Sequence, residues 1–275
     1  MADLSGRSAF VTGGFSGMGF AIATALAETG ANVAVGSYVA PPQTGGADAA
    51  YYPGADEIAH VRSALAKNGT RVYAAHLDVR DSALTDRFVA EAQAAIGPAD
   101  ILVNAAGTTA EQPVCGHSDE LWNKIVDTNL TGAFRATRAV LPAMIGRGWG
   151  RIINIGSTAA SVGWKDNPAY CASKAGLLGL TRCVALEGAP HGVTCVMISP
   201  TWVETEMMRR NVAQVVAREG KGRAAEDVID EFRRGNPQGR MMQPEEIAAL
   251  AVFLCSDLAK GITMENIQIT GGALW

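Results

Sequence analysis

Tyr170 and Lys174 stand four residues apart in the stretch YCASK, a spacing that suggests acid–base chemistry. On a helix, residues i and i+4 lie on one face, one turn apart. A free Tyr, with a pKa of about 10, is a poor general base at neutral pH. A nearby Lys ammonium favours the phenolate and lowers that pKa. The pair could therefore transfer protons, although the same spacing also arises by chance.

The elements that would position this pair follow from the hydrophobic pattern. Nearly continuous apolar runs, typical of strands buried on both faces, cover 8–12, 32–36, 71–77, 100–104, 151–156, 193–199 and 267–270. Helical stretches lie between them at 17–30, 56–69, 83–97, 121–148, 168–188 and 244–257. Such alternation, with connections too long for hairpins, predicts a parallel sheet. We expect an α/β fold in which residues 1–275 form a single doubly wound Rossmann-type domain with about seven strands and helices on both faces.

Two segments depart from the regular alternation. Residues 37–54 are rich in Pro, Gly and Ala and predict a long loop after the second strand. Residues 201–240 are dense in charge, and Met207, Met208 and Val212 suggest one or two amphipathic helices. Long segments after strands of such a sheet are often where ligands bind, so 201–240 is a candidate substrate lid.

A glycine-rich turn follows the first strand, in the stretch TGGFSGMG. Its spacing, Gly13-x-x-x-Gly17-x-Gly19, differs from the commoner G-x-G-x-x-G but occupies the same strand–turn–helix position. Glycines there permit a tight turn and let a pyrophosphate approach the N–H groups at the helix start. The alternative is a glycine turn that binds no ligand.

Six motifs in register resemble the short-chain dehydrogenase/reductase family over nearly the whole chain. They are TGGFSGMG, LDV (77–79), NAAG (104–107), DTNLTG with Asn129, NIGS with Ser157, and YCASK; Ser157 precedes Tyr170 by the family's usual interval. The resemblance implies a nicotinamide dinucleotide, NAD or NADP, as cofactor. It assigns cofactor binding to Gly13, Phe15, Ser16, Gly17, Met18, Gly19, Ser37, Tyr38, Asp78, Val79, Asn104, Ala105, Gly107, Tyr170, Lys174, Pro200, Val203 and Thr205. The chain departs from the family after Pro200, where Thr201 replaces the usual Gly. This difference is expected to affect the local backbone path and the shape of the pocket.

The resemblance also implies a catalytic set of Asn129, Ser157, Tyr170 and Lys174. Tyr170 would transfer the proton, Lys174 would lower its pKa and bind the nicotinamide ribose, and Asn129 would hold a water that joins Lys174 to solvent. Ser157 would donate a hydrogen bond to the substrate oxygen as charge develops on it. Ser157 as a turn cap and Asn129 as a solvated or capping residue remain alternatives.

The choice of nucleotide depends on the end of the second strand, where an acid would hold the adenosine ribose. Ser37 and Tyr38 stand there instead, which removes the repulsion of a 2′-phosphate. No Arg or Lys occupies position 16 or 38 to bind that phosphate. The sequence therefore favours NADP only slightly over NAD.

The expected substrate is a small molecule, either a hydroxyacyl or ketone compound or, alternatively, a polyol or sugar. Candidate substrate contacts are Ser157, Tyr170, Trp164 and Trp202, of which the two Trp could equally pack the lid. Glu111 and Gln112 follow NAAG in a region from which related sugar dehydrogenases recruit polar contacts. A remote alternative is a catalytically silent nucleotide-sensing protein on the same fold.

Composition excludes several other classes. A net charge of −4 and a pI of about 5.6 give no attraction for nucleic acid or an anionic membrane. Five scattered Cys and four His show no ligand spacing, so we expect no metal site and a reduced, cytoplasmic protein. By family resemblance we expect a homotetramer, with Trp275 partly buried against a neighbouring subunit; alternatively, Trp275 folds back on its own chain or lies disordered.

Overall fold

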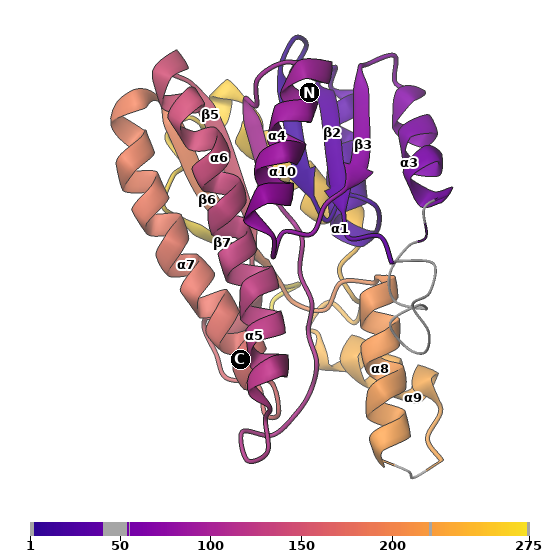
Figure 1. Ribbon diagram of the computed structural model, residues 1–275. Helices are drawn as coiled ribbons and strands as arrows, with labels where there is room; N and C mark the ends of the chain where they lie inside the picture. The colour runs from indigo at the N-terminus through magenta and orange to yellow at the C-terminus, as the bar shows by residue number, and fades with distance from the viewer. Residues whose placement is uncertain (1–2, 41–53, 55, 220–221, 274–275) are drawn as a thin grey trace.

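The computed structural model describes residues 3–40, 54, 56–219 and 222–273. In this part of the chain, seven parallel strands form one sheet in the order β3-β2-β1-β4-β5-β6-β7 (Figure 1). They are β1 (Ser8–Thr12), β2 (Asn32–Ser37), β3 (Val72–His76), β4 (Ile101–Asn104), β5 (Gly150–Ile155), β6 (Val193–Pro200) and β7 (Asn266–Ile269). Each strand agrees with its predicted run to within one residue at either end, and the doubly wound α/β prediction is confirmed.

Helices cover both faces of the sheet, and each face has its own apolar core. On one face lie α1 (Gly17–Glu28), α3 (Asp56–Ala66) and α10 (Pro244–Cys255); on the other lie α4 (Ser82–Ile96), α6 (Gly132–Arg147) and α7 (Pro168–Gly188). Successive strand residues alternate between the two cores: Ala9 and Val11 join the first, and Phe10 joins the second. This alternation explains why the strand sequences read as uninterrupted apolar runs.

The helical run predicted over 121–148 is confirmed, since residues 119–147 are helical without a gap, but the run is not α-helical throughout. It divides into α5 (Asp119–Val126), a π-helix (Asp127–Thr131) and α6. The wider π turn carries Asn129, whose buried side chain hydrogen-bonds the backbone of Thr108. Such single-turn π segments are frequent at functional sites.

The predicted lid contains two helices, α8 (Glu206–Glu219) and α9 (Ala225–Gly235). They share a small apolar cluster made by Met208, Val212, Val228, Ile229 and Met241. Figure 1 shows both helices beyond the end of the sheet toward which the strand arrows point.

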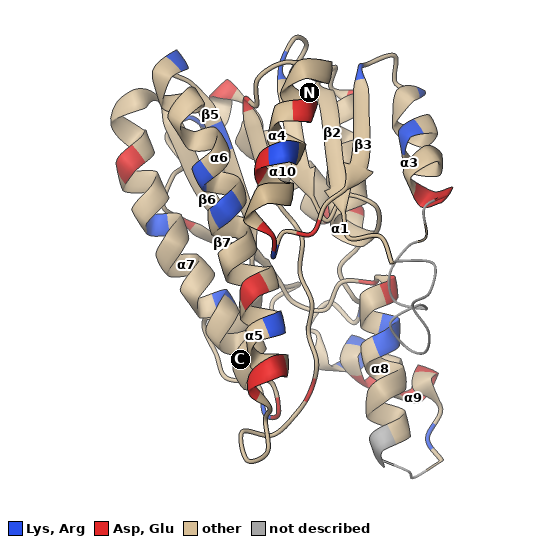
Figure 2. Cartoon of the chain, in the orientation of Figure 1, with Lys and Arg blue, Asp and Glu red and all other residues tan. Residues whose placement is uncertain are grey.

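Most of the loop predicted over 37–54 lies outside the described residues, as does Trp275. Acidic and basic positions are interspersed along the helices seen in Figure 2.

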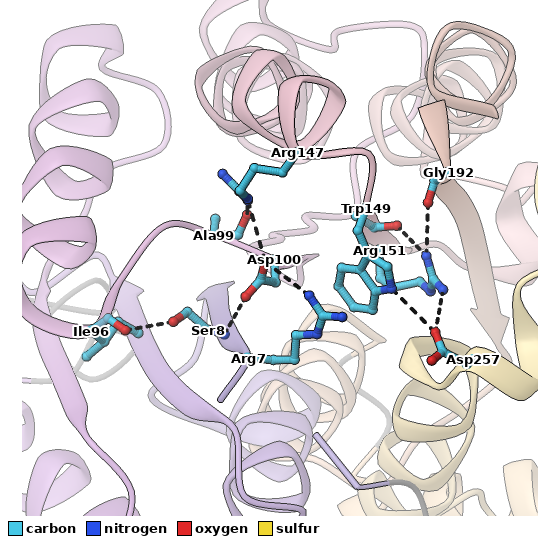
Figure 3. A network of polar contacts seen from close by, with 11 residues as sticks. Arg7, Ser8, Ile96, Ala99, Asp100, Arg147, Trp149, Arg151, Gly192 and Asp257 are labelled. Carbon is cyan, nitrogen blue, oxygen red and sulfur yellow. Dashed lines mark hydrogen bonds and ion pairs between the residues drawn. The ribbon is translucent and has the colours of Figure 1, made fainter. Parts of the chain in front are cut away.

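The amino ends of the strands are joined by a polar network around Trp149 (Figure 3). The guanidinium carbon of Arg7 lies 3.7 Å from the centroid of the Trp149 ring, and that of Arg151 lies 4.3 Å from it. Arg151 is buried and donates to the carbonyls of Gly150 (2.9 Å) and Gly192 (3.2 Å) and to the exposed carboxylate of Asp257 (3.3 Å). These contacts connect the starts of β5 and β6 to the segment that follows α10.

Replacing the buried guanidinium tests how much this network contributes to stability. Arg151→Ala should lower the free energy of unfolding by about 2 kcal/mol or more, because the carbonyls of Gly150 and Gly192 lose their charged donor and Trp149 loses a cation–π partner. Asp257→Asn, which changes only the exposed partner, should cost less than about 1 kcal/mol. Urea unfolding of both variants is the measurement, and equal losses in the two would contradict the assignment.

Candidate active site

Tyr170 and Lys174 lie on one face of the first turns of α7, which begins at Pro168 after Asn167. The Lys174 Nζ is 5.7 Å from the centroid of the Tyr170 ring. Proline at the first position of a helix sets a helical φ without losing a hydrogen bond. The abrupt start of α7 therefore places the pair at the end of the sheet where β5 and β6 finish.

The ammonium of Lys174 is buried, with only 5% of the residue exposed. Its Nζ donates to the carbonyl oxygen of Ile155, the last residue of β5, at 2.7 Å. Burial lowers the pKa of Lys174 to about 8, because desolvation disfavours the charged form. Keeping Lys174 charged therefore lowers the free energy of unfolding of the protein.

Asn129 connects the loop after β4 to α7. Its Nδ2 donates to the Thr108 carbonyl (2.9 Å) and to the Ser173 hydroxyl (3.0 Å), and its Oδ1 accepts from the Thr108 N–H (2.8 Å). A methyl group added at Gly107 would lie 3.6 Å from Asn129 Oδ1 and 3.8 Å from Lys174 Nζ. Glycine at 107 therefore keeps open the space beside both atoms.

Ser157 follows β5 and begins a short 3-10 turn, with 8% of the residue exposed. Its Oγ accepts a hydrogen bond from the Ala159 N–H at 3.1 Å. The turn-cap alternative and the substrate-binding role are therefore compatible, because a hydroxyl that accepts from the backbone still has its own proton to donate.

A cavity of about 460 Å³ lies between the glycine turn, the ends of β2, β3 and β4, and the start of the lid. Thirteen of the predicted cofactor residues line it: Gly13, Phe15, Ser16, Gly17, Met18, Gly19, Ser37, Tyr38, Asp78, Val79, Ala105, Gly107 and Thr205. We call it the nucleotide cleft. Asn104, Tyr170, Lys174, Pro200 and Val203 are not among its lining residues.

The glycine turn fits a dinucleotide diphosphate. Gly13 has φ +67°, and a Cβ there would lie 2.6 Å from the Ala106 nitrogen. A Cβ at Gly19 would collide with the carbonyl of Gly13. The Ser16 side chain makes no capping hydrogen bond, and the first turn of α1 carries no acidic residue. The start of α1 therefore presents its N–H groups and positive dipole end to an anion.

The Asn104 side chain lies in the protein interior instead of the nucleotide cleft. Its Nδ2 donates to Asn154 Oδ1 (2.8 Å) and to Thr137 Oγ1 (3.2 Å), and Asn154 Nδ2 donates to Thr181 Oγ1 (2.9 Å). This buried network connects β4 to β5, α6 and α7. Pro200 ends β6, and Val203 is buried and pairs with Met242 at the base of the lid.

The end of the cleft beside Ser37 and Tyr38 holds charged residues that the sequence did not predict. Arg80 lines it and contacts Asp78 with two nitrogens, at 2.7 Å for Nη2–Oδ2, while its guanidinium carbon lies 5.5 Å from the Tyr38 ring centroid. Arg210 of α8 also lines it and pairs with Glu206 at 3.1 Å. Burial raises the pKa of Asp78, but the hydrogen bonds and charge of Arg80 outweigh this and lower it. Ser37 accepts a hydrogen bond from the Phe15 N–H at 3.2 Å.

A second cavity, of about 440 Å³, lies between the lid and the loop before α7, and we call it the lid cavity. Trp164 and Trp202 both line it, with ring centroids 4.8 Å apart, and Trp202 stacks on Phe232 of α9 at 4.2 Å. Phe232 was missed because its ring belongs to the apolar face of a charged helix, which usually packs a core. Thr201 also lines the cavity, and its buried hydroxyl has no hydrogen-bond partner among the described residues.

Comparison with known proteins identifies the family. The family model described as short chain dehydrogenase matches residues 7–215. The chain belongs to the short-chain dehydrogenase family. It is 38% identical to D-beta-hydroxybutyrate dehydrogenase of Cupriavidus necator, over 99% of this chain and 96% of that protein. It is 35% identical to 3-oxoacyl-[acyl-carrier-protein] reductase of Escherichia coli, over 98% of both chains.

A solved structure of actinorhodin polyketide ketoreductase with NADPH superposes with a TM-score of 0.88 at 33% identity, covering 99% of both chains. The chain is accordingly an NAD(P)-dependent oxidoreductase that transfers a hydride between the nicotinamide and a secondary alcohol or ketone. Within the described residues, no helix is long and apolar enough to cross a membrane.

The lowered pKa of Lys174 predicts a specific dependence of stability on pH. The unfolded chain holds the Lys174 proton up to about pH 10.5, whereas the folded chain releases it near pH 8. The buried charge therefore destabilises the fold fully below pH 8, and the penalty disappears as the pH rises from 8 to 10.5. Urea unfolding without cofactor should show Lys174→Met more stable than the parent at pH 7, by at most about 3 kcal/mol. A stability difference that stays constant from pH 7 to 10.5 would contradict this account.

Proposed function

We propose that Tyr170 is the proton-transferring residue of this oxidoreductase and that Lys174 tunes it. The observation that carries the proposal is the buried Lys174 ammonium, held by Ile155 and placed 5.7 Å from the Tyr170 ring. A positive charge in this low-dielectric setting stabilises the phenolate strongly. When bound, the nicotinamide donates or accepts the hydride. The protein supplies the proton and fixes the position of the reacting oxygen.

Ser157 and Asn129 complete the set. Ser157, anchored by the Ala159 N–H, donates to the substrate oxygen as negative charge develops on it. Asn129 fixes Thr108 and, through Ser173, the backbone carbonyl of Tyr170, to which Ser173 Oγ donates at 2.8 Å. Its oxygen and the Lys174 nitrogen border the space kept open by Gly107, which suits the water expected to join Lys174 to solvent.

The nucleotide cleft supports NADP at least as well as NAD. The end of β2 carries Ser37 in place of a carboxylate, and two guanidinium groups, those of Arg80 and Arg210, line the same cleft. Both are paired with carboxylates, Arg80 with Asp78 and Arg210 with Glu206. We propose that the glycine turn binds the diphosphate and that Ser37, Tyr38 and Asp78 border the adenosine, with Lys174 on the nicotinamide ribose and Thr205 near the amide.

The proposed substrate is a ketone or hydroxyacyl compound, with its reacting carbon at Ser157 and Tyr170 and its remainder toward Trp164 and Trp202. The names of the hydroxybutyrate dehydrogenase and the 3-oxoacyl reductase support this class. A sugar or polyol is the second candidate, because Glu111 lines the lid cavity. The name of one similar solved structure also supports a sugar. This is L-sorbose reductase from Gluconobacter frateurii, which is 27% identical, has a TM-score of 0.87 and covers 98% of this chain.

Loss of the phenol group tests the mechanism directly. Tyr170→Phe should lower kcat by at least about a hundredfold while cofactor binding survives, because only proton transfer requires the hydroxyl. Lys174→Ala should weaken both turnover and cofactor binding. Tyr73→Phe is the matched control, since Tyr73 hydrogen-bonds Glu91 outside the cleft. Steady-state kinetics and cofactor fluorescence titration are the measurements, and a fully active Tyr170→Phe enzyme would disprove the proton-transfer role.

The role of position 37 is testable through nucleotide preference. Ser37→Asp should shift the ratio of kcat/KM values toward NADH, because the carboxylate accepts from ribose hydroxyls and repels a 2′-phosphate. Ser37→Ala removes the hydroxyl without adding charge and should shift the ratio much less. If Ser37→Asp leaves the ratio unchanged, position 37 does not border the adenosine ribose.

We further propose that residues 1–275 form one domain and assemble as a homotetramer in the cytoplasm. The sheet extends from residue 8 to residue 269, and all five Cys are unpaired, which suits a reducing compartment. Apart from Val114, the large exposed apolar side chains of the described residues occur in two groups: Trp122, Phe134 and Leu186 on α5, α6 and α7, and Phe253, Leu258 and Met264 around α10 and β7. Two separate apolar faces are what a dimer of dimers requires.

Light scattering tests the assembly. The parent protein should have four times the 28.7 kDa mass of one chain. A charge at the centre of either face, Phe134→Glu or Phe253→Glu, should reduce it to dimers because a buried unpaired charge is costly. Deleting Ala273 to Trp275 tests separately whether Trp275 contributes. A monomeric parent would refute the tetramer.

A further inference from the structure

The lid cavity is close to the proton-transferring residue. Asn167, which lines it, immediately precedes α7 and stands three residues before Tyr170, less than one helical turn along the chain. Trp164, in the loop before α7, forms part of the same wall and donates its backbone N–H to Cys171 Sγ at 3.3 Å. A substrate whose carbonyl reaches Tyr170 would therefore extend its remaining atoms into the lid cavity.

One wall of the lid cavity is a preformed stack of three aromatic rings. Trp164 comes from the loop before α7, Trp202 follows β6, and Phe232 comes from α9. The Trp202 and Phe232 planes are only 11° apart, and Trp164 is tilted by 33° to Trp202. Because the rings hold one another, they lose little side-chain entropy when a ligand packs against them. Val212 and Val228 add further apolar surface to the cavity lining.

The cavity also presents a neutral hydrogen-bond donor. Asn167 is buried and accepts from Thr109 Oγ1 at 3.1 Å, whereas its Nδ2 has no partner among the described residues. By contrast, the two arginines in the lining are occupied by carboxylates: Arg240 contacts Glu246 at 2.6 Å, and Arg223 contacts Glu231 at 2.6 Å. An amide N–H that faces a cavity gains from a neutral oxygen acceptor.

From these features we infer that the lid cavity selects ketones built on a ring that carries a further neutral oxygen, such as an ether, hydroxyl or carbonyl group. This inference rests on the proposed function, since it assigns the remainder of the same substrate. A polyol would place hydroxyls against the aromatic wall, and a linear acyl chain would leave the Asn167 amide unpaired. A short hydroxy acid would leave the cavity unfilled. An oxygenated ring would pack against the aromatic wall and accept a hydrogen bond from the Asn167 amide.

The test compares four ketones with NADPH: β-tetralone, its methoxy derivative, acetoacetate and L-sorbose. We expect kcat/KM to be highest for the methoxy derivative and to exceed that for β-tetralone by about tenfold, the usual size of a discrimination based on a small group. Both ring ketones should exceed acetoacetate and L-sorbose. Either of these small substrates turning over faster than the ring ketones would overturn the inference while leaving the proposed hydride and proton transfer intact.

Two variants identify the groups responsible. Phe232→Leu should lower kcat/KM for both ring ketones by at least about tenfold, mainly through KM, with a smaller effect on acetoacetate. Asn167→Asp replaces the amide donor by an acceptor of the same shape and should abolish the preference for the methoxy derivative. Phe88→Leu, in the core beneath α4 and in the lining of neither cavity, is the matched control for loss of a phenyl ring.

A binding measurement separates the subsite from the chemistry. The methoxy derivative should quench tryptophan emission of the cofactor-free protein, since Trp164 and Trp202 form the wall, and Phe232→Leu should weaken this binding by a similar factor. Unchanged ketone ratios and unchanged quenching in properly folded variants would refute the subsite. If none of the four ketones is turned over although NADPH binds, the proposed function fails and this inference fails with it.

Discussion

The active site depends on one costly interaction, the burial of the Lys174 ammonium against the carbonyl of Ile155. A buried ammonium persists only where the surrounding structure fixes its acceptors and no conformation of lower free energy is available to the side chain. The carbonyl at the end of β5 is one such acceptor. The charge of Lys174 therefore lowers the stability of the fold although the proposed chemistry needs it. Such a conflict between stability and function is found at many active sites.

The position of that charge is set by polar contacts within the apolar core. Asn104, Asn154 and Thr181 form a chain of hydrogen bonds from β4 through β5 to α7, and Asn154 lies one residue before Ile155. Because buried polar groups tolerate little displacement, these hydrogen bonds fix the position of α7 along β5. That position in turn sets the distance in space between Ser157, which follows β5, and Tyr170 on α7.

The sequence predicted what local patterns determine and missed what depends on side-chain direction. The strands and the glycine turn were predictable because apolar runs and glycine positions encode them directly. The π-helix at Asn129 was not, because its stabilising contacts come from Thr108, a residue distant in sequence. Asn104 was expected in the nucleotide cleft because a motif gives a position along a strand and not the face on which the side chain lies. Arg80 and Phe232 were missed for the related reason that their neighbours, Tyr38 and Trp202, come from other elements.

The network around Trp149 has a consequence for how the chain assembles during synthesis. Arg151 and Asp257 are 106 residues apart, so at about 5–20 residues per second roughly ten seconds separate their emergence from the ribosome. The strands β1 to β4 and the glycine turn are complete well before that moment. Until residue 257 arrives, Arg151 lacks the last of its partners, and the segment that follows α10 is not available to cover the starts of β5 and β6. We therefore expect the nascent chain to form its nucleotide-binding half early and to close the amino edge of its sheet only after the segment that follows α10 has emerged.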